Sequence, residues 1–214
     1  MAYSRLTDKD MSVLSRLISK ATLNAISGVA EMIGRDLAVR AVNLREIASD
    51  HVGAILKDPD GILVGIDLEI SGDADGGMLL IYPPQVALGL VDLLTGRPLG
   101  ETEKLEDMGE SALGEMGNVA GGFFLNSLAD DTGMRLLPSP PTVVTDTAGR
   151  ILERAIQLFA RDDGARVFIL QTVFTTEDRQ VSGNFLVMPN PSLLRRLIER
   201  ASIAGRLAHQ EAVQ

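Results

Sequence analysis

The sequence predicts an α/β fold in which two similar halves build one mixed sheet, and each half places a long helix on the same face of that sheet. Three observations predict it: two long segments with helical spacing of apolar residues, one segment with strict alternation, and landmark residues that recur in the same order in both halves. With 214 residues and 45% hydrophobic content, the chain can bury a core as one large domain. We therefore expect a single domain made of halves at about residues 8–96 and 102–208.

The first half begins with an amphipathic helix at about residues 8–34, where Thr7 suits the N-cap and apolar residues follow at three- and four-residue steps. Residues 37–47 alternate loosely and predict a strand. After the turn signal at residues 57–61, apolar residues occupy every second position of residues 62–70. This alternation predicts a half-buried strand.

A short apolar strand follows at residues 77–82 and is stopped by Pro83 and Pro84. The next helix ends at Gly96, and the second long helix spans about residues 104–129. Helical spacing predicts the apolar side of that helix to consist of Leu105, Met108, Ala112, Met116, Val119 and Phe123.

Landmark residues indicate that the two halves arose by duplication. The pairs are Asn24 with Asn118, Asp60-Gly61 with Asp163-Gly164, and Gly77 and Pro83 with Gly183 and Pro189. The offset between partners rises from 94 to 103 to 106, as expected if insertions lie in loops. Helical spacing in residues 148–160 then predicts a helix there and in its counterpart at residues 48–56, and a last helix is expected at residues 192–208.

Composition excludes several classes of function. A net charge of −9 argues against nucleic acid or anionic membrane as the main partner, because both repel an acidic surface. The sequence contains no cysteine, no apolar run long enough to cross a bilayer and no signal-peptide pattern, so we expect a cytoplasmic protein. The two histidines, His51 and His209, are far apart, and no Gly-x-Ser-x-Gly motif is present, so neither a metal site nor a serine hydrolase is predicted.

A polar stripe on the second long helix is the candidate functional site. Ser111, Glu115 and Asn118 are spaced to share one helix face. Each glycine inside a helix costs about 0.8–1 kcal/mol relative to alanine, yet this segment contains Gly109, Gly114, Gly117, Gly121 and Gly122. Two interpretations stay open: the glycines let the stripe enter another molecule's cleft, or they allow tight packing against a neighbouring helix while the polar residues simply face solvent.

The spacing of the stripe residues is Ser111-x-x-x-Glu115-x-x-Asn118, and Pro140 follows after 21 intervening residues. This pattern resembles the signature of the CheC, CheX and FliY family of chemotaxis phosphatases. The resemblance extends through the duplicated element order and residues 181–189, and the chain length is most similar to the CheC type. It implies a CheC-like fold and a hydrolase that removes phosphate from the aspartate of a phosphorylated CheY-type response regulator. Chemotaxis or a related two-component pathway is the implied context.

The resemblance also implies roles for the stripe. Asn118 would enter the regulator's site and orient the attacking water, a task that suits a neutral amide. Glu115 would pair with the regulator's lysine, with Ser111, Gly114, Gly121 and Gly122 supporting the contact. Pro140 is expected to shape a loop or the start of a strand. The Mg²⁺ would come from the regulator, so no cofactor or metal of its own is expected.

The first half departs from the family pattern. Aligning Asn24 with Asn118 places Leu17, Ala21 and Glu46 at the other signature positions. Because no carboxylate then stands at residue 21, we predict one working site on the second helix and a degenerate first site of which Asn24 is the remnant.

Two other functions remain open from the sequence. The first is a non-catalytic module that docks on a response regulator or on the CheD deamidase, with the stripe as a contact. The second is a component of the flagellar switch. The effect of Asn118→Ala separates them from a phosphatase, because only a phosphatase loses turnover.

Overall fold

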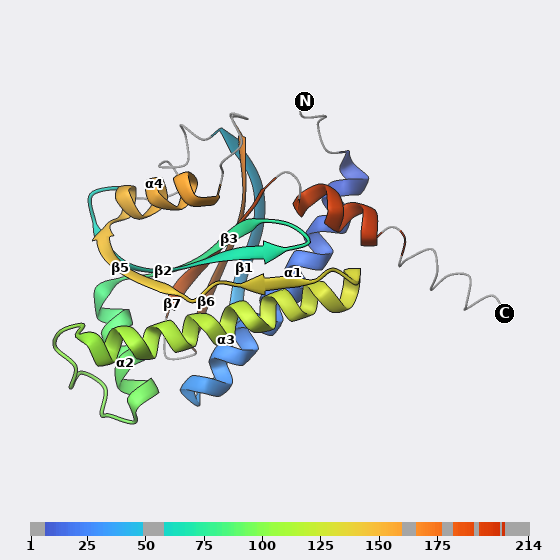
Figure 1. Cartoon of the computed structure of the whole chain (residues 1–214). Coiled ribbons are helices and arrows are strands. Elements are labelled where there is room, and N and C mark those ends of the chain that lie inside the picture. The colour runs from blue at the N-terminus through green and yellow to red at the C-terminus, as the bar shows by residue number, and fades with distance from the viewer. Residues whose placement is uncertain are drawn as a thin grey trace.

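A computed structural model of the chain describes residues 7–48, 58–159, 166–176, 182–190, 193–201 and 203. Four helices and seven strands have defined bounds, and residues 193–201 form a further helical segment (Figure 1). In chain order the elements are α1 (Asp8–Ile33), β1 (Leu37–Ala48), β2 (Ile62–Gly72), β3 (Gly76–Tyr82), α2 (Pro84–Thr95), α3 (Asp107–Thr132), β4 (Leu136–Pro138), β5 (Thr142–Thr147), α4 (Ala148–Phe159), β6 (Arg166–Thr176) and β7 (Ser182–Pro189).

The seven strands form one sheet in the order β1-β6-β7-β3-β2, and β4 and β5 both pair with β2. Every pairing between the described strands is antiparallel, so the predicted mixed sheet is corrected to an antiparallel one. The reason is symmetry. The equivalent strands β3 and β7 are neighbours, and a twofold axis normal to the sheet can relate neighbours only if they run in opposite directions.

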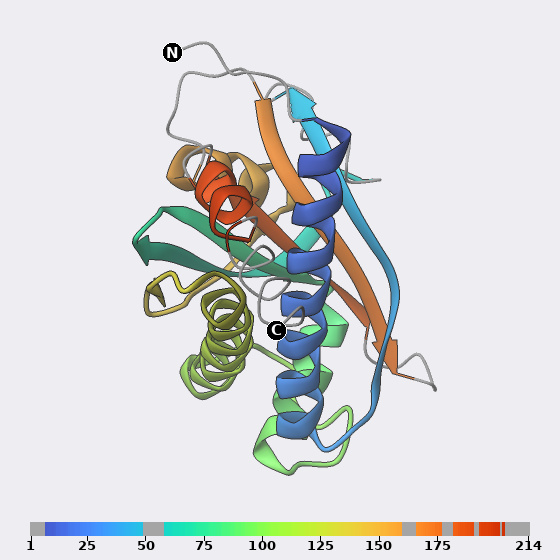
Figure 2. The same ribbon diagram turned by 90° about the vertical axis from the view of Figure 1, so that its right-hand side faces the viewer.

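The pairing pattern confirms the predicted internal duplication. Exchanging the halves turns the β1–β6 pair into β5–β2 and the β6–β7 pair into β2–β3. The long helices α1 and α3 have 26 residues each and pack against one another on the same face of the sheet (Figure 2). They run in opposite directions, because Lys20 of α1 bonds Asp131 of α3 at 2.6 Å, whereas Gly28, further along α1, lies against Phe123, which comes earlier in α3.

Local chemistry sets the helix bounds. Thr7 caps α1 with a capping box, and α1 and α3 end at Gly34 and Gly133 in the left-handed conformation. The helix predicted at residues 104–129 therefore begins and ends three residues later, at Asp107 and Thr132.

Apolar side chains fill both faces of the sheet. One core cluster joins the sheet to α1, α2, α3 and residues 193–201, and a smaller one joins it to α4. Because β2 lies between both clusters, its residues 64–68 are all buried, and the predicted half-buried strand is wrong for this stretch. Arg154 of α4 also donates to Asp67 of β2 at 3.1 Å. The helix predicted at residues 148–160 is confirmed as α4. Of the helix expected at residues 48–56, Ala48 is instead the last residue of β1, and the rest lies outside the described residues. His51, His209 and the turn at residues 163–164 also lie outside them.

The buried side of α3 differs from the predicted one. Of the predicted set only Met116 is buried, and Met108 and Phe123 are exposed at 64% and 43%. The large buried side chains are instead Leu113, Met116, Phe124, Leu125 and Leu128. Both sets have helical spacing, so spacing could not choose between them.

The loop before α3 is held by the buried carboxylate of Asp92 in α2. Asp92 accepts hydrogen bonds from the amides of Gly100 and Thr102 at 2.7 and 2.9 Å, and from the Thr102 hydroxyl. Burial acts to raise the pKa of Asp92, but these hydrogen bonds, with one from the Glu101 amide, outweigh it and hold the pKa below its ordinary value. The carboxylate thereby holds the loop that leads into α3.

We expect Asp92→Asn to lower the free energy of unfolding at pH 7 by about 1.5–3 kcal/mol, because the amide cannot accept all of these bonds. Since the folded pKa lies below the ordinary value of 3.8, the ionised carboxylate stabilises the fold above that pH and loses its effect as pH falls through the folded pKa. Urea unfolding should therefore show a wild-type advantage at pH 7 that shrinks below about pH 4. Asp130→Asn, on the exposed side of α3, serves as control; a difference that grows at pH 3 would contradict the assignment.

Candidate functional site

Helix α3 places the side chains of Ser111, Glu115 and Asn118 on its solvent-exposed side. The Ser111 hydroxyl donates to the backbone carbonyl of Asp107 at 2.8 Å, a bond within the helix. Within the described part of the chain, Glu115 and Asn118 have no hydrogen-bond or ion-pair partner. One carboxylate and one amide are therefore available to a second molecule.

Of the five glycines of α3, Gly109 packs against Val91 of the neighbouring helix α2, as one interpretation predicted, and the other four fall into two groups. A Cβ on Gly117 would lie 2.6 Å from Ile66 Cγ2, and one on Gly121 would lie 3.0 Å from Leu68 Cδ2. These two buried glycines let α3 approach β2 closely, so tight packing is confirmed for them, against the sheet rather than a neighbouring helix. Gly121 is thus not at the surface where a partner contact was predicted. Gly114 and Gly122 are partly exposed, and nothing lies within 4 Å of a Cβ on Gly122.

The segment around Pro140 runs beside the glycine side of α3. Pro138 and Pro141 lie 3.6 Å from the Cβ positions of Gly121 and Gly117, respectively. Ser139 ties the segment to β2, since its amide donates to the Glu69 carbonyl at 2.8 Å and its hydroxyl accepts from the Glu69 amide at 2.9 Å. Pro140 is exposed in the loop between β4 and β5, which is the loop position predicted for it.

Two substitutions separate the packing glycines from the exposed ones. Gly117→Ala should lower the free energy of unfolding by about 1–3 kcal/mol, because its methyl would overlap the fully buried Ile66. Gly122→Ala, five residues on in the same helix, meets nothing and should raise stability by up to about 0.8–1 kcal/mol through helix propensity. Urea unfolding of both proteins measures the contrast. Equal stabilities would refute the close approach of α3 to β2.

The two long helices correspond at an offset of 99 residues. Asp107 follows Asp8 by 99 residues, and Thr132 follows Ile33 by the same number. Each of the ten buried residues of α1 has a buried counterpart in α3 at this offset; the α1 members are Leu14, Leu17, Ile18, Ala21, Thr22, Ala25, Ile26, Gly28, Val29 and Ile33. The offset of 94 given by matching Asn24 with Asn118 is therefore wrong for the helices.

This register changes which residues of α1 correspond to the signature positions of α3. The counterparts of Ser111, Glu115 and Asn118 are Ser12, Arg16 and Ser19. Asn24 corresponds instead to Phe123, so it is not the remnant of a site. The residue-by-residue match of burial fixes the register, whereas a single shared asparagine does not. The signature position of the first helix still lacks a glutamate, as expected, because Arg16 occupies it.

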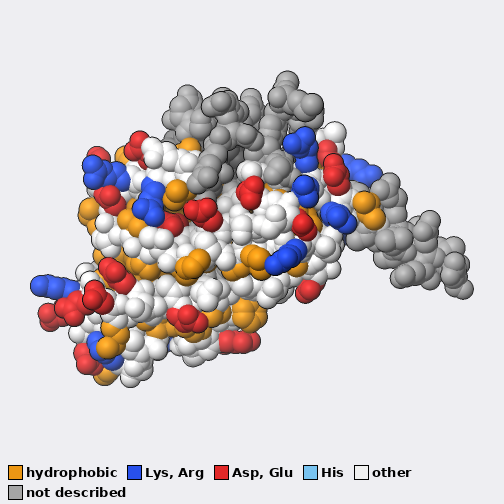
Figure 3. Space-filling view, in the orientation of Figure 1, with side chains coloured by type: hydrophobic (Ala, Val, Ile, Leu, Met, Phe, Trp, Pro, Cys, Tyr) orange, Lys and Arg blue, Asp and Glu red, His pale blue; other side chains and the backbone are white. Residues whose placement is uncertain are grey.

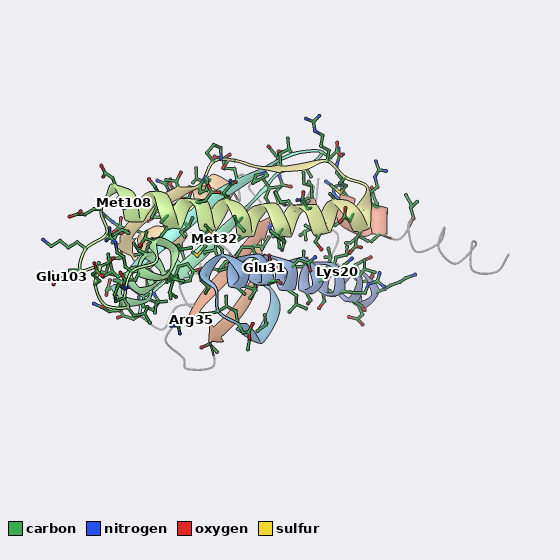
Figure 4. All side chains as sticks on the ribbon, turned by 90° about the horizontal axis from the view of Figure 1, so that it is seen from below. Lys20, Glu31, Met32, Arg35, Glu103 and Met108 are labelled. Carbon is green, nitrogen blue, oxygen red and sulfur yellow. The ribbon has the colours of Figure 1, made fainter. Side chains whose placement is uncertain are left out.

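The surface around the stripe is acidic at one end and carries an exposed methionine that sequence reasoning assigned to the core. Figure 3 shows acidic side chains gathered at the lower left, where α3 begins; the exposed ones are Glu101, Glu103, Glu106, Asp107 and Glu110. Met108 lies two turns before Glu115, and its sulfur is 3.8 Å from Arg97 Nη2 (Figure 4). Its helical spacing fitted either side of α3, and only packing shows that it faces solvent.

No helix among the described residues has the length and apolar content required to cross a bilayer. Within the same residues, no three His, Cys, Asp or Glu side chains are grouped so that they could hold a metal ion.

Comparison with known proteins connects this helix to a family. Residues 108–145, which contain the stripe, the close-packed glycines and Pro140, match the model of the CheC-like family. This segment is CheC-like. The resemblance to the CheC, CheX and FliY family that the signature predicted is thereby confirmed. The chain is also 23% identical over 198 residues to the CheY-P phosphatase CheC of Bacillus subtilis (strain 168), covering 91% of this chain and 95% of CheC.

Solved structures share the fold. FliY of Thermotoga maritima matches with a TM-score of 0.73 at 21% identity, over 94% of this chain and 100% of FliY. The FliM middle domain of H. pylori matches at 0.61 and 9% identity, over 91% and 99% of the two chains. A chain of the CheX–CheY–BeF₃–Mg²⁺ complex of Borrelia burgdorferi matches at 0.52 and 19% identity, over 80% and 97%. The CheC-like α/β fold with an internal pseudo-twofold is confirmed.

Proposed function

We propose that this protein is a phosphatase that hydrolyses the aspartyl phosphate of a CheY-type response regulator, with Asn118 and Glu115 as its acting residues. One observation carries the proposal: an exposed Ser111–Glu115–Asn118 stripe lies on the segment that matches the CheC-like family. The similarity to a CheY-P phosphatase over most of the chain supports it.

The chemistry requires little from this chain. An aspartyl phosphate in a regulator's site already has Mg²⁺ and a lysine to neutralise charge, so a phosphatase has to place a water in line with the phosphorus. The Asn118 amide can accept from one side of that water and donate on the other without changing its ionisation. The water's proton leaves to solvent or phosphate as the P–O bond to aspartate breaks and inorganic phosphate forms.

Glu115 supplies the docking contact. Glu115 lies about one turn before Asn118 on the same side of α3, so a salt bridge to the regulator's lysine would set the depth to which Asn118 enters. The close packing of Gly117 and Gly121 on β2 keeps the backbone of this turn fixed while both side chains project outward. Such a site needs a rigid scaffold because its reach must match the partner's pocket.

Asn118→Ala should slow phosphate release from the phosphorylated regulator by about 100-fold, the range found for removing one positioned polar group, with regulator binding nearly intact. Asn24→Ala and Asn126→Ala remove exposed asparagines from α1 and α3 and should leave turnover unchanged. The assay is phosphate release from CheY-type regulators of the same cell, each phosphorylated with acetyl phosphate. An unchanged decay rate of every regulator with wild-type protein would refute the phosphatase.

Met108 extends the docking surface. Its side chain is 64% exposed, and two turns separate it from Glu115 on the same side of α3. Met108→Glu should raise KM by about tenfold with kcat retained, because an interface anchor is lost while the reacting groups stay. Met108→Leu should keep KM, and Ile62→Glu, another exposed apolar position, serves as a control away from the stripe. A fall in kcat alone would exclude this role.

A non-catalytic docking function is the second candidate, since the FliM middle domain has the same fold. In that case the stripe would bind a regulator, or CheD, without turnover. Binding of a regulator by wild-type protein with no acceleration of phosphate release would favour it.

A further inference from the structure

Helix α1 carries a surface that is equivalent to the stripe on α3. At the offset of 99 residues, Ser12, Arg16 and Ser19 take the places of Ser111, Glu115 and Asn118. Ser12 and Arg16 are exposed like their counterparts, and Ser19 is partly exposed where Asn118 is exposed. Since all ten buried residues of α1 have buried counterparts in α3, the two helices present these positions to solvent in the same way.

The charge of the two surfaces is opposite. Residues 11–30 of α1 contain two charged residues, Arg16 and Lys20, and no carboxylate. The equivalent residues 110–129 of α3 contain Glu110 and Glu115 and no Lys or Arg. Lys20 is bonded to Asp131, so Arg16 is the other charged side chain of this stretch. A positive side chain thus occupies the position at which α3 offers a carboxylate.

We propose that Arg16 excludes the response regulator from α1, so that one chain binds and dephosphorylates one regulator at a time. The inference rests on the proposed function. A regulator that approached α1 as it approaches α3 would bring its lysine onto the Arg16 guanidinium, and like charges in a closed contact weaken binding strongly. Ser19 adds a second defect, because its hydroxyl is shorter than the Asn amide and cannot reach as far into a pocket.

The α1 surface is intact as a scaffold. The helix is capped by Thr7 and Gly34, and its buried side belongs to the main core. The two surfaces lie at opposite ends of the helix pair, since Asn118 is 13 residues, or about 20 Å, from Asp131 beside Lys20. Figure 4 shows Lys20 and Met108 on the two antiparallel helices, far apart along the pair. A site restored on α1 would thus act without help from α3.

The test restores the missing residues in a protein whose α3 site has been removed. The parent is E115A/N118A, and the substitutions R16E and S19N are added to it. We expect phosphate release from the acetyl-phosphate-treated regulator to rise at least about tenfold above the parent. The matched control adds R150E and S19N instead, which changes the net charge equally at an exposed arginine of α4, away from both long helices, and should restore nothing.

Each outcome decides the question. The inference is overturned if the variant with all four substitutions has the same melting temperature by circular dichroism as its parent and is still inactive. In that case Arg16 and Ser19 are not what excludes the regulator. The inference is also overturned if N118A keeps half of the wild-type phosphatase activity. Sedimentation that shows two regulators bound per wild-type chain overturns it as well.

Failure of the proposed function looks different: wild-type protein would not accelerate any regulator's decay. Sedimentation still tests the inference then, because R16E/S19N in the wild-type background should raise the bound regulator from one to two per chain. No second regulator bound to this variant would overturn it.

Discussion

The close approach of α3 to β2 is the constraint on which the candidate site depends. Gly117 and Gly121 bring the helix backbone onto Ile66 and Leu68, where no Cβ would fit without movement. Once these glycines face the sheet, the helical period turns the side chains of Glu115 and Asn118 to solvent. The cost of glycine in a helix is therefore offset by a fixed helix position.

The two halves share the buried positions of their long helices and differ at the exposed positions. The buried sides of α1 and α3 match at every position of α1, because both helices cover the same sheet and contact each other. Packing tolerates little change there. The exposed positions are free of this constraint, so Arg16 and Glu115 can differ in charge while the helices keep one register.

The two ends of α3 are held in different ways. At its start, the Asp92 carboxylate ties down the preceding loop through bonds to backbone amides, and Gly109 packs against Val91 of α2. At its end, Lys20 bonds Asp131, a pair on the exposed side that contributes at most about 1 kcal/mol. The position of the stripe thus depends on buried contacts more than on surface charge.

The sequence alone determined the helix and strand segments near the site and the signature on α3. Thr7, Gly96 and the alternation over residues 62–70 act through local backbone and side-chain preferences, which operate before any tertiary contact forms. The Ser111–Glu115–Asn118 spacing likewise needs only a helix to share one side. Only the tertiary structure decided which side of α3 is buried, that the strands are antiparallel, and that Ser19 rather than Asn24 corresponds to Asn118. Two apolar sets on α3 had helical spacing, and the sheet packs against one of them.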